Sequence, residues 1–174
     1  MSSSPPSSIP GLAEATAALT AKGGLFELIT CRVAGVELRC YRDVPPTIRD
    51  LVVRGRRWGA REYLIYEDER LTYEACFARV ATLAHRLVGE LGVRKGDRVA
   101  IAMRNYPEWV IAFWAAASVG AICVPLNAWW TGPELAYGLL DSGSRVLFAD
   151  GERIERAAGG WDVADGSAAQ GVIN

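Results

Sequence analysis

The chain has 174 residues, of which 51% are hydrophobic and 22% are charged, with 19 basic against 20 acidic side chains. This composition is typical of a globular domain that buries one core, and the balanced charge excludes a strong attraction to nucleic acid or to anionic lipid. Cys31, Cys40, Cys76, Cys123 and the single histidine, His85, have no metal-ligand spacing. A metal site is therefore not expected. The expected location is the cytoplasm, where the thiols are reduced.

The first 45 residues contain a polar lead and two local elements. Residues 1–10, "MSSSPPSSIP", are expected to be disordered, because serine and proline cannot bury enough apolar surface to offset chain entropy, and they do not have the regions of a signal peptide. Residues 11–45 contain an alanine-rich segment that ends in Gly-Gly, which predicts a helix. A partly alternating segment follows and turns at Ala34-Gly35, which predicts a β-hairpin.

The next segment predicts a helix, a pair of strands and a longer helix. A helix is expected from Thr47, and the residues Tyr63–Tyr66 and those around Leu71 are strand-like, with the turn residues "EDER" between them. Thr72 can cap a helix in which apolar residues recur at steps of three and four, so one face is expected to be buried. Gly92 ends this helix, and "RVAIAM" is short enough to be a buried strand.

An uncharged run from Trp109 to Pro133 raises the question of a membrane span. A spanning helix needs about 20 apolar residues without a break in the backbone pattern. Here Gly120, Pro125 and Asn127 interrupt the run. The pattern favours a helix of about three turns before Gly120 and a strand, "AICVPLN", after it, so no transmembrane span is expected.

A capping box is expected where the next helix begins. The Thr131 hydroxyl can accept from the N–H of Glu134 while the carboxylate reaches back, and the helix should continue to Leu140 and end at Gly143. The strand "RVLFAD" follows. Helices therefore alternate with strands, which predicts an α/β fold over residues 46–158, in which βαβ units form a mainly parallel sheet covered by helices.

Several quoted segments occur in a familiar order. These are "DERLTYEACFARVATLAHRL", "GVRKGDRVAIAMRNYPEWVIAFWAAASVGAICVPLNAWWTGPELAYGLLDSG" and "RVLFAD". Together they resemble the N-terminal part of acyl-CoA synthetases of the acyl-adenylate-forming (AMP-binding) superfamily, and most closely the fatty-acid–CoA ligases. The resemblance implies an incomplete N-terminal subdomain of the adenylate-forming fold.

For the full-length family the resemblance implies ATP, Mg²⁺ and coenzyme A as cofactors and a fatty acid or other carboxylic acid as substrate. The carboxylate forms an acyl-adenylate, and the thiol of coenzyme A then displaces AMP. The family's phosphate loop and its later motifs are not found in this chain. The nearest approach is "DSGSR", Asp141 to Arg145, which has one glycine and no lysine and is better explained as a helix end. No cofactor-binding, catalytic or metal residue is therefore assigned.

Residues 159–174 are small and weakly patterned. The expectation is a truncated or frame-shifted gene product that is inactive alone. The alternatives are a non-catalytic interaction module that packs on a complementing chain or forms a homo-oligomer, and, less favoured, a small membrane-associated protein.

Two loops attract attention as contact sites. Trp129 and Trp130 follow a parallel strand at the edge where open α/β sheets bind ligands, so they are candidates for an acyl-chain contact, a membrane-surface contact or packing onto a neighbouring domain. Asn105 and Glu108 lie in a similar loop, where initiation of the next helix is the favoured explanation.

Three side chains with reactive groups are expected to be structural. His85 has no Ser or Cys partner that the sequence assigns to it, so it is not named as a catalytic base. Cys76 and Cys123 have apolar neighbours and are expected to pack in the core.

Overall fold

The computed structural model describes residues 11–157 and 169–172, and the lead at residues 1–10 lies outside them. The chain divides into two compact units, residues 1–46 and 47–174. In the first unit a helix, α1 (Leu12–Thr20), precedes the antiparallel strands β1 (Leu28–Val33) and β2 (Val36–Tyr41). The hairpin turns at Ala34 and Gly35, both with positive φ, as the sequence predicts.

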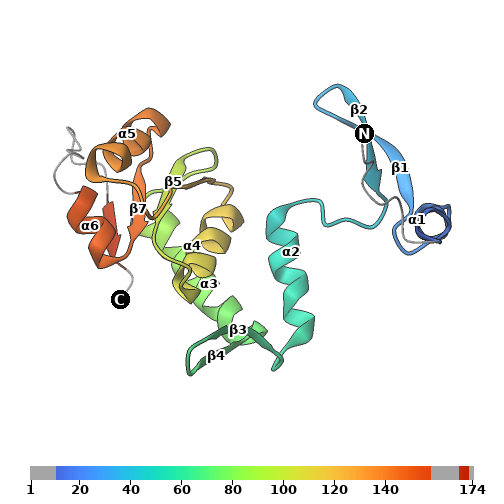
Figure 1. The fold of residues 1–174 in the computed structure, drawn as a ribbon, viewed down its shortest axis with the longest axis horizontal. Coiled ribbons are helices and arrows are strands. Elements are labelled where there is room, and N and C mark those ends of the chain that lie inside the picture. Colours follow the sequence, from blue (N-terminus) through green and yellow to red (C-terminus); the bar gives the residue numbers. More distant parts are fainter. Residues whose placement is uncertain (1–10, 158–168, 173–174) are drawn as a thin grey trace, which may run out of the picture. The chain divides into compact units, whose positions relative to one another are not determined.

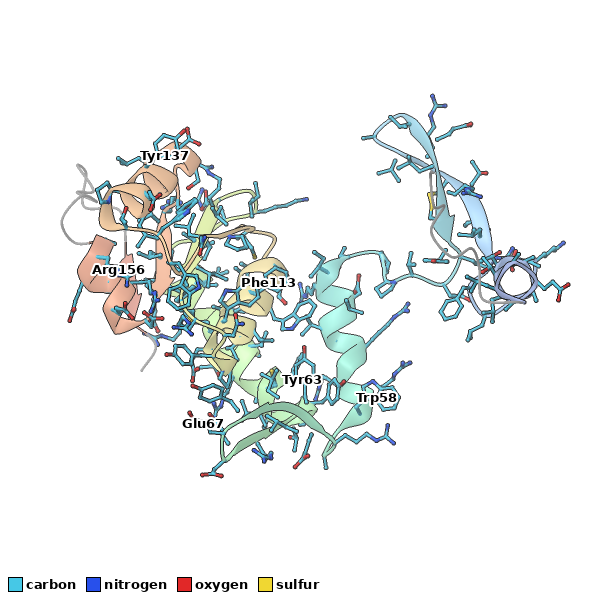
Figure 2. All side chains as sticks on the ribbon, viewed as in Figure 1. Trp58, Tyr63, Glu67, Phe113, Tyr137 and Arg156 are labelled. Carbon is cyan, nitrogen blue, oxygen red and sulfur yellow. A yellow bond between two sulfur atoms is a disulfide. The ribbon has the colours of Figure 1, made fainter. Side chains whose placement is uncertain are left out.

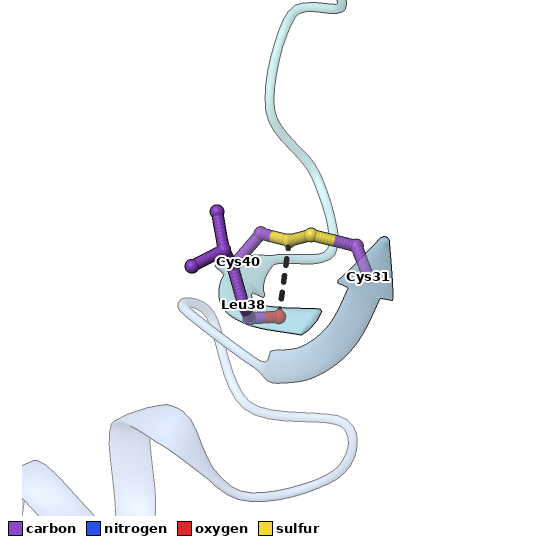
Figure 3. Close-up of a disulfide and its surroundings, with 3 residues drawn as sticks. All are labelled: Cys31, Leu38 and Cys40. Atoms are coloured by element: carbon purple, nitrogen blue, oxygen red, sulfur yellow. Dashed lines mark hydrogen bonds between the residues drawn. A yellow bond between two sulfur atoms is a disulfide. The ribbon is translucent and has the colours of Figure 1, made fainter. Parts of the chain in front are cut away.

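A disulfide between Cys31 and Cys40 crosses this hairpin (Figure 3). Cys31 lies opposite Leu38 in the antiparallel register, so Cys40, two residues further, points to the same face, with a Cα–Cα distance of 6.3 Å. This is within the range that a disulfide requires. The expectation of four reduced thiols is therefore wrong for this pair, because the sequence spacing alone does not show which strand positions share a face.

The pairing predicts a thiol count that a mass measurement can check. Alkylation of the denatured, unreduced chain should modify only Cys76 and Cys123, and alkylation after reduction should modify all four cysteines. Four modified thiols before reduction would contradict the hairpin disulfide. A Cys31→Ser, Cys40→Ser double variant provides the control, because it should give two modified thiols under both conditions.

The second unit begins with three helical or hairpin elements. The helix α2 (Ile48–Gly55) is capped by Thr47, whose hydroxyl accepts from the Asp50 N–H at 3.2 Å, and it leads into a short 3-10 turn, η1 (Arg56–Trp58). The strands β3 (Glu62–Tyr66) and β4 (Glu69–Thr72) form a separate antiparallel pair.

The main sheet of this unit is parallel and has the strand order β6-β5-β7-β8. Its two central strands, β5 and β7, are labelled in Figure 1. Its strands are β5 (Arg98–Ala102), β6 (Ile122–Pro125), β7 (Val146–Ala149) and β8 (Ala169–Val172). The helices between and before them are α3 (Tyr73–Gly89), α4 (Pro107–Ser118), α5 (Gly132–Ser142) and α6 (Gly151–Ala157). The predicted α/β class is confirmed, whereas the sequence pattern placed no strand at β8.

The helices cover both faces of the sheet in two apolar layers. Alternate residues of β5, such as Val99 and Ile101, pack with α3 and α4, whereas Ala100 and Ala102 pack with α5 and α6. Within the first layer, the Trp114 indole N–H donates to the Tyr63 hydroxyl at 3.1 Å, which joins α4 to β3. The burial of successive β5 residues on opposite faces is what a parallel strand covered on both sides requires.

The uncharged run folds as the helix α4 and the strand β6. Pro107 occupies the first turn of α4, and Gly120, with a φ of 79°, ends it. Across the described ranges, residues 11–157 and 169–172, no helix is both long and apolar enough to cross a membrane.

Candidate functional site

The carboxyl ends of β5, β6 and β7 bring three loops to one edge of the sheet. The connection after β5 runs through α4 to β6 on one side, and the connection after β7 runs through α6 to β8 on the other. The connections that leave the neighbouring strands β5 and β7 therefore run in opposite directions. Open α/β sheets bind ligands at the point where this happens. The two loops are joined directly, because the backbone N–H of Arg104 donates to the carboxylate of Asp150 at 3.0 Å.

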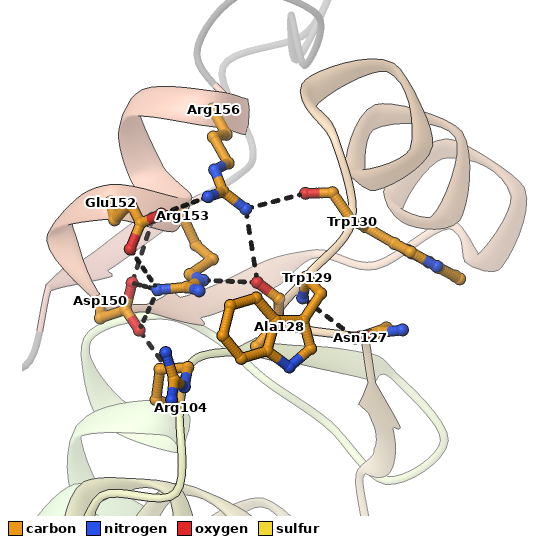
Figure 4. A network of polar contacts seen from close by, with 9 residues as sticks. All are labelled: Arg104, Asn127, Ala128, Trp129, Trp130, Asp150, Glu152, Arg153 and Arg156. Atoms are coloured by element: carbon orange, nitrogen blue, oxygen red, sulfur yellow. Dashed lines mark hydrogen bonds and ion pairs between the residues drawn. The ribbon is translucent and has the colours of Figure 1, made fainter.

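Trp129 lies at this edge, beside Arg104 and Arg153 (Figure 4). Its side chain is 66% exposed, and its backbone N–H donates to the Asn127 side-chain oxygen at 3.0 Å. The guanidinium carbon of Arg104 lies 4.2 Å from the centre of the indole ring, and that of Arg153 lies at 5.9 Å. Both distances are within the range of a cation–π contact, so the ring is held beside two positive charges.

Trp130 has a different environment from its neighbour. It packs against the apolar layer of α5 and α6 together with Leu126. A Cβ atom added at Gly138 would lie 2.9 Å from its ring, so α5 has a glycine where this indole approaches. Of the two predicted contact residues, only Trp129 presents a largely exposed ring, and the contact itself stays a prediction.

Two arginines of α6 hold the loop that carries these tryptophans. Arg153 is 2% exposed and donates from Nε to the carbonyl of Ala128 at 2.7 Å, while its Nη1 contacts the carboxylates of Asp150 at 3.3 Å and Glu152 at 2.8 Å. Arg156 donates to the carbonyl of Trp130 at 3.2 Å and also pairs with Glu152. The loop is thus fixed by charged hydrogen bonds to its carbonyl oxygens. The Nη2 atom of Arg153 is buried and has no partner among the described residues.

The helix that follows the loop begins with the predicted capping box. The Glu134 carboxylate accepts from the backbone N–H of Thr131 at 2.8 Å and from its hydroxyl at 2.9 Å. These contacts lower the pKa of Glu134, with the backbone donor as the largest cause and the hydroxyl as the second. The carboxylate therefore helps to fix where α5 starts, directly after Trp130.

Glu134→Gln should lower stability at neutral pH and have a smaller effect in acid. A carboxylate whose native pKa lies below its usual value of 4.5 stabilises the fold above that value, and the contribution is lost as the pH falls through the native pKa. Urea unfolding of both proteins at neutral pH and at about pH 3 measures this. The difference between the midpoints should shrink in acid, and a constant difference would show that the charge of Glu134 is not responsible.

The other reactive side chains have structural surroundings. Cys76 is buried and Cys123 is half buried, and in each case burial is the main cause of a raised pKa, so both thiols are poor nucleophiles. Gly143, in "DSGSR", has a φ of 59° and ends α5, as the helix-end explanation predicts. His85 lies exposed on α3, and Asn105 and Glu108 lie where α4 begins.

A comparison with protein families gives a match to the AMP-binding enzyme family over residues 51–170. The chain belongs to this AMP-binding family. Among curated members of the family, the Long-chain-fatty-acid–CoA ligase FadD13 of Mycobacterium tuberculosis is 42% identical over 83 residues, which are 46% of this chain and 16% of that protein. The Feruloyl-CoA synthase of an Amycolatopsis species is 43% identical over 88 residues, 51% of this chain and 18% of that one.

Solved structures of AMP-binding enzymes share the fold of this chain. The N-terminal domain of FACL13 from Mycobacterium tuberculosis superposes with a TM-score of 0.65 at 29% identity, over 74% of this chain and 34% of that one. A fatty acyl CoA synthetase from Mycobacterium tuberculosis superposes with a TM-score of 0.64 at 30% identity, over 73% and 26%. The chain thus spans between 16% and 34% of the length of these relatives.

Proposed function

We propose that the second unit forms the N-terminal part of an ATP-dependent ligase that joins a fatty acid or related carboxylic acid to coenzyme A. The observation that carries the proposal is the family match over residues 51–170. It is supported by the curated relatives, which are named as a CoA ligase and a CoA synthase, and by a solved fatty acyl CoA synthetase that shares the fold. The activity belongs to the longer protein in this proposal, and the chain alone is expected to be inactive.

The proposed reaction has two steps. A carboxylate oxygen attacks the α-phosphorus of ATP, the bond to the bridging oxygen breaks, and pyrophosphate leaves. The sulfur of coenzyme A then attacks the acyl carbonyl carbon, the thiol proton is released, and AMP leaves. When bound, Mg²⁺ spreads the negative charge of the phosphates.

The described residues do not fit the phosphates or the metal. In the described ranges no group of three or more His, Cys, Asp or Glu side chains could hold a metal ion. The glycine loop at the end of α5 accepts rather than donates, because the Arg98 guanidinium donates to the carbonyls of Ser142 and Gly143, each at 2.9 Å. Carbonyl oxygens at a helix C-terminus repel a phosphate. We therefore derive no chemical step from these residues, and their proposed role is to form the sheet on which the catalytic parts assemble.

A second candidate function is a non-catalytic module that packs on a complementing chain or on another copy. The exposed Trp129 with Arg104 stacked on it favours this candidate, because tryptophan and arginine are enriched among the residues that dominate interface energies. In either case we propose a cytoplasmic location, in which Cys31 and Cys40 are reduced and form the hairpin disulfide only once the chain is purified. Alkylation of thiols before cell lysis tests the location, since a reducing compartment should leave Cys31 and Cys40 open to modification.

A chimera tests the ligase proposal. Residues 47–157 would replace the corresponding segment of the FadD13 ligase, and the chimera is expected to retain ATP–pyrophosphate exchange that depends on fatty acid. A version in which the segment is deleted is the negative control. A folded chimera with no exchange would count against the ligase proposal.

The same chimera tests whether Trp129 packs on the rest of a ligase or serves the second candidate function, packing on a partner chain. If the indole packs on the rest of the ligase, Trp129→Ala should weaken exchange in the chimera while leaving the isolated chain folded. Tyr137→Ala is a matched control, because Tyr137 is 68% exposed on α5 and carries no stacked arginine within the described ranges (Figure 2). Equal exchange by the Trp129→Ala and unaltered chimeras would show that Trp129 does not pack on the rest of the ligase.

A further inference from the structure

The hairpin of β1 and β2 has an apolar face and a polar face. Val33 lies opposite Val36 in the antiparallel register, and Leu38 follows two residues later on the same face, which also carries the disulfide. These three side chains are 55%, 58% and 48% exposed, respectively. The other face carries the charged Glu37 and Arg39. An isolated two-stranded hairpin is only marginally stable in water, and further strands beside it would stabilise it.

The outer edge of β2 is unpaired within residues 11–157 and 169–172, because β2 pairs with β1 alone. A two-residue turn joins the carbonyl of the residue before it, here Val33, to the N–H of the residue after it, here Val36. The direction of these groups alternates along a strand, so the backbone groups of Glu37 and Arg39 point away from β1. Neither residue has a backbone hydrogen bond to another described segment. Such an edge is a template for another strand.

The sequence of β2 is complementary to itself when two copies run antiparallel. A two-fold axis at Leu38 places Glu37 opposite Arg39 of the second copy, and the reverse pair forms on the other side of the axis. The apolar Val36 then lies opposite Cys40 of the second copy, on the other face of the sheet. Opposite charges that face each other across two strands stabilise their pairing.

The charges of Glu37 and Arg39 have no ion-pair partner in the part of the chain that the structure describes, whereas Arg42 of the same unit pairs with Glu27 at 2.6 Å. Both side chains are exposed. A second copy would therefore supply each of them with a partner of opposite charge at the surface, where the cost of removing charges from water is small.

We propose that two copies of this chain associate through the outer edges of β2, so that their hairpins form one four-stranded antiparallel sheet. Both copies use the same surface, as dimers with two-fold symmetry do. The edge of β1 does not fit, because a two-fold axis at Thr30 would place Arg32 opposite Leu28. This inference goes beyond the proposed ligase, because the hairpin precedes residues 51–170, which match the family.

Sedimentation equilibrium of the full chain over a range of concentrations tests the proposal. The mass should rise from 18.8 kDa toward twice that value as the concentration increases. Glu37→Arg should raise the dissociation constant about tenfold, because both pairs of opposite charges become pairs of arginines. Glu14→Arg is the matched control, since it makes the same change of charge at an exposed position of α1, and it should leave the dissociation constant unchanged.

A second charge reversal tests the register of the pairing. Arg39→Glu should weaken association as Glu37→Arg does, because glutamates then lie opposite each other. An equimolar mixture of the two single variants should associate as the unaltered chain does, because each arginine again faces a glutamate. The double variant Glu37→Arg, Arg39→Glu should also recover the original dissociation constant. The mass of each unreduced variant checks that the hairpin disulfide is intact.

Three results would overturn the proposal. These are a mass of 18.8 kDa at every concentration, equal dissociation constants for the Glu37→Arg and Glu14→Arg variants, and no recovery of association in the mixture of the single variants. A dimer that Trp129→Ala disrupts and Glu37→Arg leaves intact would place the interface at the carboxyl edge of the main sheet, and it would also overturn the proposal.

Discussion

Replacing Arg153 with methionine is expected to lower the free energy of unfolding by about 3 kcal/mol, near the lower end of the range for removing one partner of a buried ion pair. The side chain is 2% exposed, and its loss would remove the donors to the carbonyl of Ala128 and to the Asp150 carboxylate. Two features moderate the effect. Asp150 keeps the backbone donors of Arg104 and Arg153, and the variant also removes the buried Nη2 atom that has no partner.

Chemical unfolding of the variant and of an exposed control measures this effect. Arg86→Met removes an exposed pair with Glu90 and should cost less than about 1 kcal/mol. A double-mutant cycle of Arg153→Met with Asp150→Asn should show a coupling between the two sites. An Arg153→Met variant as stable as the unaltered chain would show that this charged network does not hold the loop of Trp129.

Phe148→Ala should destabilise the chain by about 3 to 5 kcal/mol, the range for removing a large aromatic side chain from a core. Phe148 is 1% exposed and lies opposite Ile101 in the parallel register of β5 and β7. The truncation leaves a cavity between the sheet and the helices α3 and α4, and close-packed neighbours fill such a space only in part.

The matched control for Phe148→Ala is Ile122→Ala on the edge strand of the same sheet. Ile122 is 53% exposed, so its truncation should cost clearly less. Unfolding midpoints in urea with unchanged slopes would report the difference. Similar losses for both variants would mean that the β5–β7 pair is not the centre of the core.

The fold is predictable from the sequence wherever the signal is local. The capping box of Thr131 and Glu134, the stop at Gly143 and the helix of "PEWVIAFWAAAS" depend on neighbouring residues, and each occurs in the structure. The alternation of these elements then restricts the sheet to a parallel one, because short helical crossovers connect parallel strands. The α/β class followed from such local signals.

The candidate site was only partly predictable, because its contacts join segments that are far apart in the chain. Their shared position in a loop made both Trp129 and Trp130 candidates. Only the packing distinguishes them, because the Trp129 ring stacks with Arg104 whereas the Trp130 ring packs near Gly138. The role of Arg153 was missed, since it contacts Ala128 across 25 residues of sequence. Half of the residues in "GERIERAA" are charged, so the sequence offers no signal that distinguishes the buried Arg153 from an exposed arginine.

The disulfide was missed for a related reason. Cys31 and Cys40 are nine residues apart, and whether they face each other depends on the register of the hairpin. A shift of one residue would place the two side chains on opposite faces. Composition suggested reduced thiols, and the turn at Ala34 and Gly35 decided the pairing instead.

ATP–pyrophosphate exchange by the purified 174-residue chain, with and without fatty acid, tests the central claim most directly. The claim is that these residues form the N-terminal scaffold of an AMP-binding ligase and do not hold the phosphates. The account predicts no exchange by this chain, whether or not fatty acid is added, with exchange in the FadD13 chimera under the same conditions. Exchange that depends on fatty acid in the isolated chain would contradict it, because a phosphate site would then exist within these residues.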